Sequence, residues 1–227
     1  MKKTKIDWCD CTINPVVGCK NGCKYCYAEK INDRFKFIPC WRKPKFFEDR
    51  LKQLKSRKPK SVFMDSMSDI VWWEKAWCEK VFNAMQENPQ HNYIFLTKCY
   101  SSIIRSCVKL GRGRLKNVFF GATITTQEQL KSYRINAFEP FDFLSVEPLL
   151  EPINFRRDLG ASPKLMIIGA ETGTRKDKVI PKKEWVDNIV KFCNENKIKV
   201  FMKESLREIM GKEFRQDQLP WEIKKDG

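Results

Sequence analysis

The sequence predicts an α/β fold, a partial (βα) barrel of about six to seven parallel strands. Two observations predict it. Short apolar runs typical of strands alternate along the chain with helical patterns, and polar side chains follow most of these runs. Strands that alternate with helices favour a parallel sheet with right-handed crossover connections. A doubly wound, flavodoxin-like sheet is the alternative topology.

The predicted strands are runs of β-branched, aromatic and other apolar residues. We expect the first strand around residues 14–18, which read Asn-Pro-Val-Val-Gly. The others are expected at residues 61–65, 93–96, 118–121, 143–146, 165–168 and 200–202. A chain of 227 residues can bury one sizeable core, so we expect a single domain over residues 1–227.

Helices are expected between many of these strands. An apolar side chain recurs at every fourth position at Trp73, Trp77, Val81 and Met85, which predicts one apolar helix face that packs on the sheet. Residues 125–128 read Thr-Thr-Gln-Glu, which is typical of a helix start. Further core-facing helical positions are Leu130, Tyr133, Trp185, Ile189 and Phe192.

Polar side chains follow six of the predicted strands. The carboxyl ends of parallel strands lie at one edge of a sheet, and in (βα) barrels this edge collects the chemistry. We therefore expect one ring of functional side chains at that edge. Its members are Ser66, Asp69, Thr97, Lys98, Thr123, Glu147, Glu171 and Lys203.

Cys19, Cys23 and Cys26 form a Cys-x3-Cys-x-aromatic-Cys pattern. A structural zinc site requires four protein ligands. An iron–sulfur cubane that is held by three thiolates keeps one iron open for a group that is not protein, which in radical chemistry is S-adenosylmethionine. Gly18 and Gly22 allow the loop of residues 18–27 to fold tightly around such a cluster.

Composition predicts a cytoplasmic protein that does not enter a membrane. Hydrophobic residues make up 42% of the chain, yet no apolar run approaches the length of a membrane span, and the charged start leads into no apolar signal core. Ten cysteines without an export signal fit reduced thiols. We expect the only histidine, His91, to be a surface group. The cysteines interpreted as small buried residues are Cys40, Cys78, Cys99, Cys107 and Cys193.

The formal net charge is +16, and residues 1–60 contribute +11 of it. The densest basic segment is 41–60, in which lysines and arginines are interleaved with Trp41, Phe46 and Phe47. Basic residues with nearby aromatic rings suit a phosphate backbone with a stacking base, so we expect the stretch from Arg42 to Lys60 to contact nucleic acid. A solvated lysine-rich helix face is the alternative.

The cysteine pattern, with Tyr25 before its last cysteine, resembles the signature of radical S-adenosylmethionine enzymes. The resemblance covers about residues 4–205. In detail, the chain is similar to an uncharacterised, phage-associated branch of these enzymes. Where that branch reads Trp-Thr-Asp-Ala-Thr-Trp-Asn-Pro, this chain has Trp-Cys-Asp-Cys-Thr-Ile-Asn-Pro, so Cys9 and Cys11 look like local substitutions and not ligands. The similar segments are residues 4–8, 14–19, 25–29, 66–69, 96–98, 144–150 and 168–173.

The resemblance implies a partial barrel of the radical S-adenosylmethionine type and roles for individual residues. Cys19, Cys23 and Cys26 would bind a 4Fe-4S cluster, and Glu147 and Lys203 would contact the substrate as catalytic residues. Ser66, Ser68 and Asp69 would lie near the methionyl amino group, and Gly169 and Glu171 near the adenine. The residues implied in cofactor binding are Tyr25, Ser66, Ser68, Asp69, Thr97, Thr123, Gly169 and Glu171.

The implied activity is reductive cleavage of S-adenosylmethionine to a 5′-deoxyadenosyl radical, which abstracts hydrogen from a substrate. A nucleic acid or nucleotide is the favoured substrate, and a low-potential donor such as flavodoxin or ferredoxin would supply the electron. The alternative is a basic nucleic-acid-binding protein with a structural zinc knuckle, whose fourth ligand would be Cys9, Cys11 or Cys40.

Overall fold

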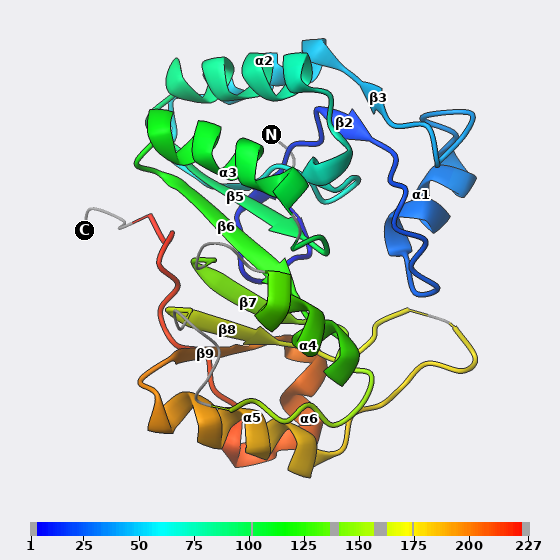
Figure 1. Ribbon diagram of the computed structural model, residues 1–227, viewed down its shortest axis with the longest axis vertical. Helices are drawn as coiled ribbons and strands as arrows, with labels where there is room; N and C mark the ends of the chain where they lie inside the picture. Colours follow the sequence, from blue (N-terminus) through cyan, green and yellow to red (C-terminus); the bar gives the residue numbers. More distant parts are fainter. Residues whose placement is uncertain (1–3, 101, 137–140, 157–162, 174, 224–227) are drawn as a thin grey trace. The chain divides into compact units, whose positions relative to one another are not determined.

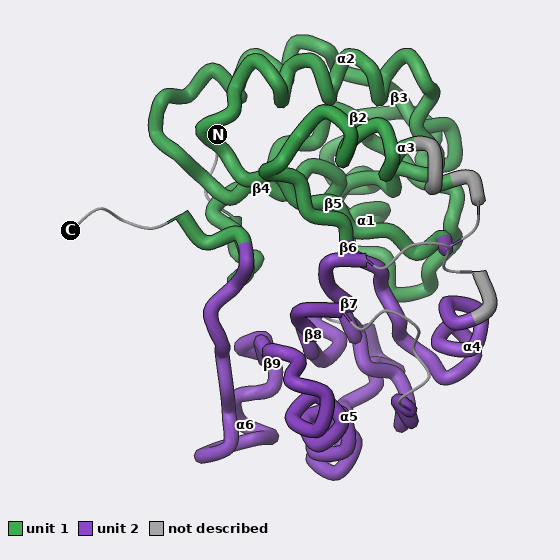
Figure 2. Tube along the Cα trace, turned by 60° about the vertical axis from the view of Figure 1, so that its left-hand side comes forward, with its two compact units in different colours: residues 1–99, 103–120, 221–227 green, residues 100–102, 121–220 purple. Residues whose placement is uncertain are grey.

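A computed structural model describes residues 4–100, 102–136, 141–156, 163–173 and 175–223. The chain divides into two compact units, coloured separately in Figure 2. Unit 1 comprises residues 1–99, 103–120 and 221–227, and unit 2 comprises residues 100–102 and 121–220. None of the described helices is long and apolar enough to cross a membrane.

Within the described residues, the main sheet contains seven strands in the order β1-β4-β5-β6-β7-β8-β9 (Figure 1). The strands follow chain order, which is the singly wound topology of a (βα) barrel and excludes the doubly wound alternative. The α/β class and the expected parallel pairing are therefore confirmed. The strands are β1 (Cys11–Thr12), β4 (Ser61–Phe63), β5 (Asn92–Thr97), β6 (Val118–Thr123), β7 (Phe143–Val146), β8 (Leu165–Ile168) and β9 (Lys199–Met202).

The expected first strand at residues 14–18 is wrong. The strand that pairs with β4 is Cys11–Thr12, where Cys11 lies opposite Val62. Val16 and Val17 instead form β2 (Val16–Val17), which pairs antiparallel with β3 (Lys45–Phe46) in a separate two-stranded sheet. Pro15 donates no backbone hydrogen bond, and its carbonyl accepts one from the backbone N–H of Phe47, so the chain leaves the main sheet before it.

The helices lie between the strands, as the alternation predicts, and each long one buries an apolar face. The expected face is confirmed at Val81 and Met85 of α2, which are buried, whereas Trp77 is half-buried and Trp73 is buried just before the helix begins. The expected start of α4 is also confirmed, since the Thr126 hydroxyl accepts a hydrogen bond from the backbone N–H of Gln129. The helices are α1 (Tyr27–Phe35), α2 (Lys75–Gln86), α3 (Ser102–Arg114), α4 (Gln127–Asn136), α5 (Lys183–Glu195) and α6 (Arg207–Met210), with 3-10 turns η1 (Glu48–Lys55), η2 (Ile70–Trp72), η3 (Glu204–Leu206) and η4 (Gly211–Glu213).

The core of unit 1 contains an aromatic stack under α2 and α3. The rings of Phe95 and Phe120 stack at 5.3 Å between centroids, and Phe82 of α2 meets Phe95 edge-on. A Cβ atom at Gly111 of α3 would lie 2.8 Å from the Phe120 ring, so glycine lets the helix approach the sheet closely. The two helices also meet at Cys78 and Cys107, whose sulfurs lie 3.7 Å apart.

His91 is buried, contrary to its expected place on the surface. Its side chain is fully enclosed, its Nε2 lies 2.9 Å from the carbonyl oxygen of Leu54, and its ring meets that of Tyr93 edge-on. Burial lowers the pKa of His91, so the ring is neutral at physiological pH. Cys40, interpreted above as buried, is exposed, whereas Cys78 and Cys193 are buried as expected.

Unit 2 packs α5 against β8 and β9. Val186, Ile189 and Phe192 of α5 are buried, and the Cys193 thiol contacts the sulfur of Met166 in β8 at 3.8 Å. Ile189 and Phe192 are buried as expected, whereas Trp185 is only half-buried and its neighbour Val186 is buried in its place. The predicted helix face is therefore confirmed at two positions and wrong at Trp185.

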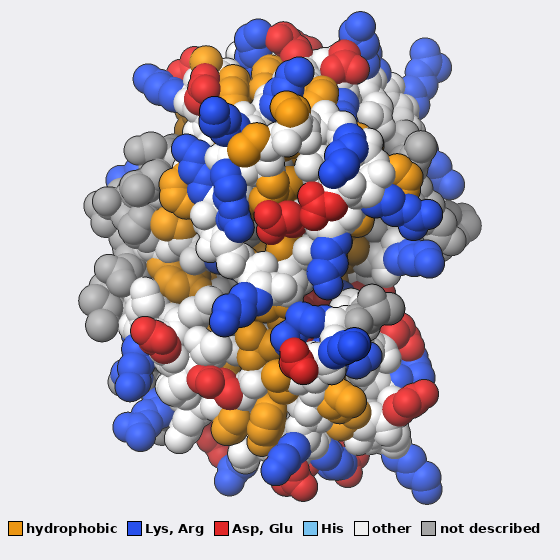
Figure 3. Space-filling model, turned by 90° about the vertical axis from the view of Figure 1, so that its right-hand side faces the viewer, with side chains coloured by type: hydrophobic (Ala, Val, Ile, Leu, Met, Phe, Trp, Pro, Cys, Tyr) orange, Lys and Arg blue, Asp and Glu red, His pale blue; other side chains and the backbone are white. Residues whose placement is uncertain are grey.

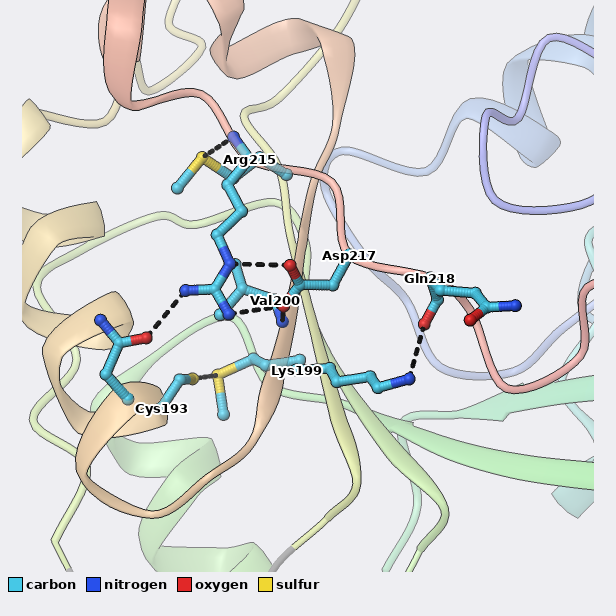
Figure 4. Close-up of polar contacts among 9 residues, drawn as sticks. Cys193, Lys199, Val200, Arg215, Asp217 and Gln218 are labelled. Carbon is cyan, nitrogen blue, oxygen red and sulfur yellow. Dashed lines mark hydrogen bonds and ion pairs between the residues drawn. The ribbon is translucent and has the colours of Figure 1, made fainter.

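The segment after η4 returns along β9 and is held by a charged pair (Figure 4). The Arg215 guanidinium donates two hydrogen bonds to the Asp217 carboxylate, at 2.9 and 2.5 Å, and one to the side-chain oxygen of Asn194. Asp217 also accepts the backbone N–H of Val200 in β9 at 2.8 Å. Hydrogen bonds from Arg215 and Val200 hold the pKa of Asp217 below its usual range.

We predict that Asp217→Asn lowers the free energy of unfolding by about 1 kcal/mol, because a partly exposed ion pair is replaced by a neutral contact. The pKa of Asp217 is lower in the folded than in the unfolded protein, so its stabilisation is complete above about pH 4 and is lost as the pH falls further. Urea unfolding at several pH values would measure this. Plotted against pH, the free energies of unfolding of the wild type and of Asp217→Asn should converge below about pH 4. Glu204→Gln, which alters the exposed Glu204–Arg207 pair, is the control and should change the free energy of unfolding little.

Candidate functional site

The cysteine loop lies in unit 1 directly after β2, where the backbone leaves no room for a side chain. Gly18 has a φ of +110°, and a Cβ atom there would lie 2.8 Å from both the Pro44 Cα and the Trp41 carbonyl oxygen. The backbone N–H of Gly18 donates to Met67, and that of Cys19 donates to Trp41. The loop is thus fixed between the turn after β4 and the basic segment.

Two of the three sulfurs already accept backbone hydrogen bonds. The N–H of Asn21 points to the sulfur of Cys19 at 3.5 Å, and the N–H of Glu29 points to that of Cys26 at 3.4 Å. Cys26 is the N-cap of α1, so its sulfur lies at the positive end of a nine-residue helix. Both features stabilise negative charge on sulfur, as thiolate ligands of an iron–sulfur cluster require.

Burial keeps these thiols protonated in the free protein. It raises the pKa of Cys19 to about 12, opposed by the hydrogen bond from Asn21 and reinforced by the charge of Asp69. Burial likewise raises the pKa of Cys26. Metal binding at these sulfurs would therefore release protons.

Cys19, Cys23 and Cys26 are the candidate metal ligands on this loop. Among the described residues, no three Cys, His, Asp or Glu side chains are arranged to hold one metal ion. A cubane binds each cysteine to a different iron, so its three sulfurs do not converge on one point. The three cysteines lie on one loop, and backbone N–H groups point at the sulfurs of two of them, Cys19 and Cys26.

The buried carboxylate of Asp69 joins the cysteine loop to the ends of two strands. Its Oδ2 accepts from the Asn21 side chain at 2.7 Å and from the backbone N–H of Lys98 at 3.0 Å. Its Oδ1 accepts from the Thr97 hydroxyl at 2.7 Å and from the backbone N–H of Val71 at 3.2 Å. Asp69 is 3% exposed, so these four donors replace the water that the carboxylate loses.

A second carboxyl group, that of Asp65, is buried near Asp69. Its Oδ1 accepts the backbone N–H of Leu96 at 3.1 Å, while Oδ2 has no hydrogen-bond partner among the described residues. Burial and the nearby charge of Asp69 raise the pKa of Asp65 well above its usual range. The shift favours the protonated form of Asp65, which carries no charge beside Asp69.

The two serines expected near the cofactor both have protein partners. The Ser66 hydroxyl donates to the side-chain oxygen of Asn14 at 3.0 Å, and the Ser68 hydroxyl accepts from the Trp73 indole at 3.0 Å. The Tyr25 ring lies under the Lys98 ammonium at 5.9 Å. Unit 1 therefore brings Tyr25, the serines, Asp69 and Thr97 to the side of the cysteine loop.

In unit 2, Glu147 and Lys203 form an ion pair over Gly169. These residues directly follow β7, β8 and β9, and the side chains of the pair are 22% and 15% exposed. A Cβ atom at Gly169 would lie 3.0 Å from the Lys203 Cδ and 3.2 Å from the Glu147 Cγ. The glycine therefore leaves the space in which the two flanking side chains meet.

Glu171 and Thr123 also lie in unit 2. The Glu171 side chain is 4% exposed and makes a two-pronged ion pair with Arg175, at 2.7 and 2.8 Å. The Thr123 hydroxyl is buried and has no hydrogen-bond partner in the described part of the chain, as is true of Ser145, its register neighbour on β7. Two such hydroxyls on one face of the sheet are suited to a polar ligand or a buried water.

Two asparagines in the site were not found by sequence reasoning. Asn21 bridges the Asp69 carboxylate and the Trp72 indole, which donates to the Asn21 side-chain oxygen at 2.6 Å. Asn14 holds the turn at Ser66 and Met67 through its side-chain oxygen. The signal for Asn21 was its position between two cysteines of the pattern, where its side chain reaches Asp69 and Trp72.

The chain belongs to the family described as a protein of unknown function (DUF5131), whose model matches residues 3–216. No curated protein and no solved structure is significantly similar to it.

We predict that Gly18→Ala lowers the free energy of unfolding by at least about 2 kcal/mol, because it combines a strained φ with contact against the backbone of Pro44 and Trp41. Gly22→Ala is the matched control in the same loop. Its φ is +75° but its nearest neighbour is the flexible Arg42 guanidinium at 3.5 Å, so we expect a cost of about 1 kcal/mol. Urea unfolding followed by circular dichroism compares them, and equal losses would contradict the close approach at Gly18.

Proposed function

We propose that this member of the DUF5131 family is a radical S-adenosylmethionine enzyme that acts on a nucleic acid or nucleotide. The observation that carries the proposal is the cysteine loop. Its three thiols lie on one turn, backbone N–H groups point at two of the sulfurs, and Asn21 and Asp69 tie the turn to the ends of β4 and β5.

Cys19, Cys23 and Cys26 would hold a 4Fe-4S cluster. When bound with S-adenosylmethionine, such a cluster supplies the electron that cleaves the sulfonium to methionine and a 5′-deoxyadenosyl radical. The protein's part is to hold the thiolates, to stabilise their charge through the N-terminus of α1, and to shield the site with the apolar cluster on which Cys19 and Cys26 pack.

Asp69 would act by positioning the loop. Its two carboxylate oxygens accept from four protein donors, and one of these is the Asn21 side chain between Cys19 and Cys23. This differs from the direct contact with the methionyl amino group that the resemblance implies. The backbone turn from Ser66 to Asp69 is the segment that we propose for that contact.

Glu147 and Lys203 would contact the substrate or exchange a proton with it. A carboxylate and an ammonium held together at 22% and 15% exposure can accept and donate hydrogen bonds to a polar ligand. Gly169 would set the spacing of the pair, and the Thr123 hydroxyl would serve as a further donor.

Two partners complete the proposal. A low-potential donor such as flavodoxin or ferredoxin would supply the electron, and the basic segment 41–60 would bind the polynucleotide. The segment borders the cysteine loop directly, since Trp41 accepts from Cys19 and Arg42 pairs with Glu29 at 3.6 Å. A bound polynucleotide would thus lie beside the proposed cluster.

We predict that Cys19→Ala, Cys23→Ala and Cys26→Ala each abolish the iron and sulfide content after anaerobic reconstitution, because each removes one thiolate. Cys9→Ala and Cys40→Ala are the controls and should keep wild-type content. Metal and sulfide analysis measures the result. A colourless protein with stoichiometric zinc, lost in Cys9→Ala or Cys40→Ala, would instead establish the zinc knuckle.

We also predict that the reconstituted protein, reduced with dithionite, converts S-adenosylmethionine slowly to 5′-deoxyadenosine without added substrate. Chromatography of the products measures it. The control is the variant that lacks all three loop cysteines. If the wild type yields no more 5′-deoxyadenosine than this variant, the enzyme proposal fails even where iron is bound.

A further inference from the structure

An exposed pair of aromatic rings lies at the end of α1. The Phe35 and Phe37 side chains are 58% and 44% exposed, and their rings stack at 5.9 Å between centroids, 28° from parallel. Large exposed apolar side chains are normally scattered singly, so two stacked rings form an unusual surface. The pair lies within unit 1, in the part of the chain just before the basic segment.

The turn that carries the pair is anchored by hydrogen bonds and by a buried side chain. Lys36, between the two rings, has a φ of +52° and caps the helix, with its N–H donating to the Asn32 carbonyl. The buried Asn32 side chain donates to the Ile38 carbonyl at 3.1 Å and accepts the Ile38 N–H at 3.0 Å. Ile38 is 2% exposed, so this turn is anchored in the core while both rings face outward.

Positive groups alternate with these rings. The Arg34 guanidinium lies over Phe35 at 5.1 Å, and that of Arg50 lies 5.8 Å from Phe37 and 4.3 Å from Phe47. The Lys45 ammonium lies over the Phe47 ring, 5.5 Å from its centroid. We call this row the α1 aromatic surface; its members are Arg34, Phe35, Phe37, Arg50, Phe47 and Lys45.

Of the rings expected from the sequence to stack on bases, Trp41 and Phe46 pack against other parts of the protein. Trp41 is only 7% exposed and belongs to the apolar cluster under the cysteine loop. Phe46 stacks on Trp77 at 5.9 Å between centroids. Among the described residues, the large exposed aromatic side chains are Tyr27, Phe35 and Phe37, of which Phe35 and Phe37 stack on each other and precede the basic segment.

The same apolar cluster links this surface to the cysteine loop. Ile38 lies in that cluster, and Phe47, Cys19 and Cys26 pack against it. Figure 3 shows Lys and Arg side chains gathered around hydrophobic ones on the face that carries α1, with a small acidic group among them. A ligand on the α1 aromatic surface would lie close to the loop.

We propose that the α1 aromatic surface binds single-stranded nucleic acid, with unpaired bases stacked on Phe35 and Phe37 and phosphates contacted by Arg34, Lys36 and Lys45. Sequence-tolerant single-strand sites combine aromatic platforms with cations in this way. A duplex keeps its bases stacked on one another and offers the rings no base face, so it binds less tightly. The binding does not depend on the proposed cluster.

The test is fluorescence anisotropy of the purified protein with a labelled twelve-nucleotide oligothymidylate. Phe35→Ala with Phe37→Ala should weaken binding at least about fivefold, since removing the platform for one stacked base costs that much or more. Phe35→Trp with Phe37→Trp should restore it, and Ile180→Ala, at a 67% exposed apolar side chain in unit 2, should leave it unchanged. An abasic oligonucleotide of equal length should bind weakly and should not respond to the phenylalanine changes.

The charges are tested by a salt series. Changing Arg34, Lys36 and Lys45 together to Gln should lower the log–log salt slope by about 2 units, at about 0.7 for each phosphate that is no longer neutralised. Lys176, Lys191 and Lys212 changed together to Gln remove the same charge from exposed positions in unit 2 and should lower it less. These measurements need no iron, so they can fail while the enzyme proposal stands.

Three results would overturn the proposal. The first is oligonucleotide binding that the phenylalanine-to-alanine changes leave intact, because the rings would then serve a protein partner or no partner. The second is equal affinity for the abasic strand, which would reduce the surface to a polyanion site. The third is equal salt slopes in the two charge-removed variants, which would place the phosphate contacts elsewhere.

Discussion

The buried Asp69 carboxylate is the contact on which the proposed centre in unit 1 depends. Removing a carboxylate from water is costly unless donors replace the water, and here four do. These donors come from the cysteine loop, η2 and the end of β5, which are far apart in sequence. The hydrogen bonds that this one carboxylate needs therefore hold three segments together.

In unit 2, the candidate site depends on the space left by a glycine and not on a buried charge. Glu147 and Lys203 come from strands that flank β8, and they meet because Gly169 at the end of β8 has no side chain. Any larger residue would occupy the space between the two charges. The resemblance implies that Gly169 allows close approach of the cofactor. Within the protein, the same glycine also leaves room for Glu147 and Lys203 to pair.

The sequence was sufficient for the features that depend on local pattern. Strand positions, the face of α2 and the cap of α4 all follow from periodicity or from one side chain and its neighbours. It was insufficient for features that depend on a contact with a residue far away in the sequence. β1 is only Cys11–Thr12, two residues whose strand character comes from pairing with β4, and the burial of His91 comes from the Leu54 carbonyl. The bridge from Asn21 to Asp69 spans 48 residues and leaves no periodic signal.

The way the cysteine loop is held bears on the choice between a cluster and a zinc knuckle. Small zinc modules usually depend on the metal for their fold, because few other contacts fix the ligand loop. In this protein the loop is fixed by Gly18 against the backbone of Trp41 and Pro44 and by Asn21 against Asp69, none of which uses a thiolate. Its shape does not require a fourth ligand to close it. A loop organised in advance around three cysteines is what a cluster with one open iron needs, since that iron must stay accessible to a small molecule.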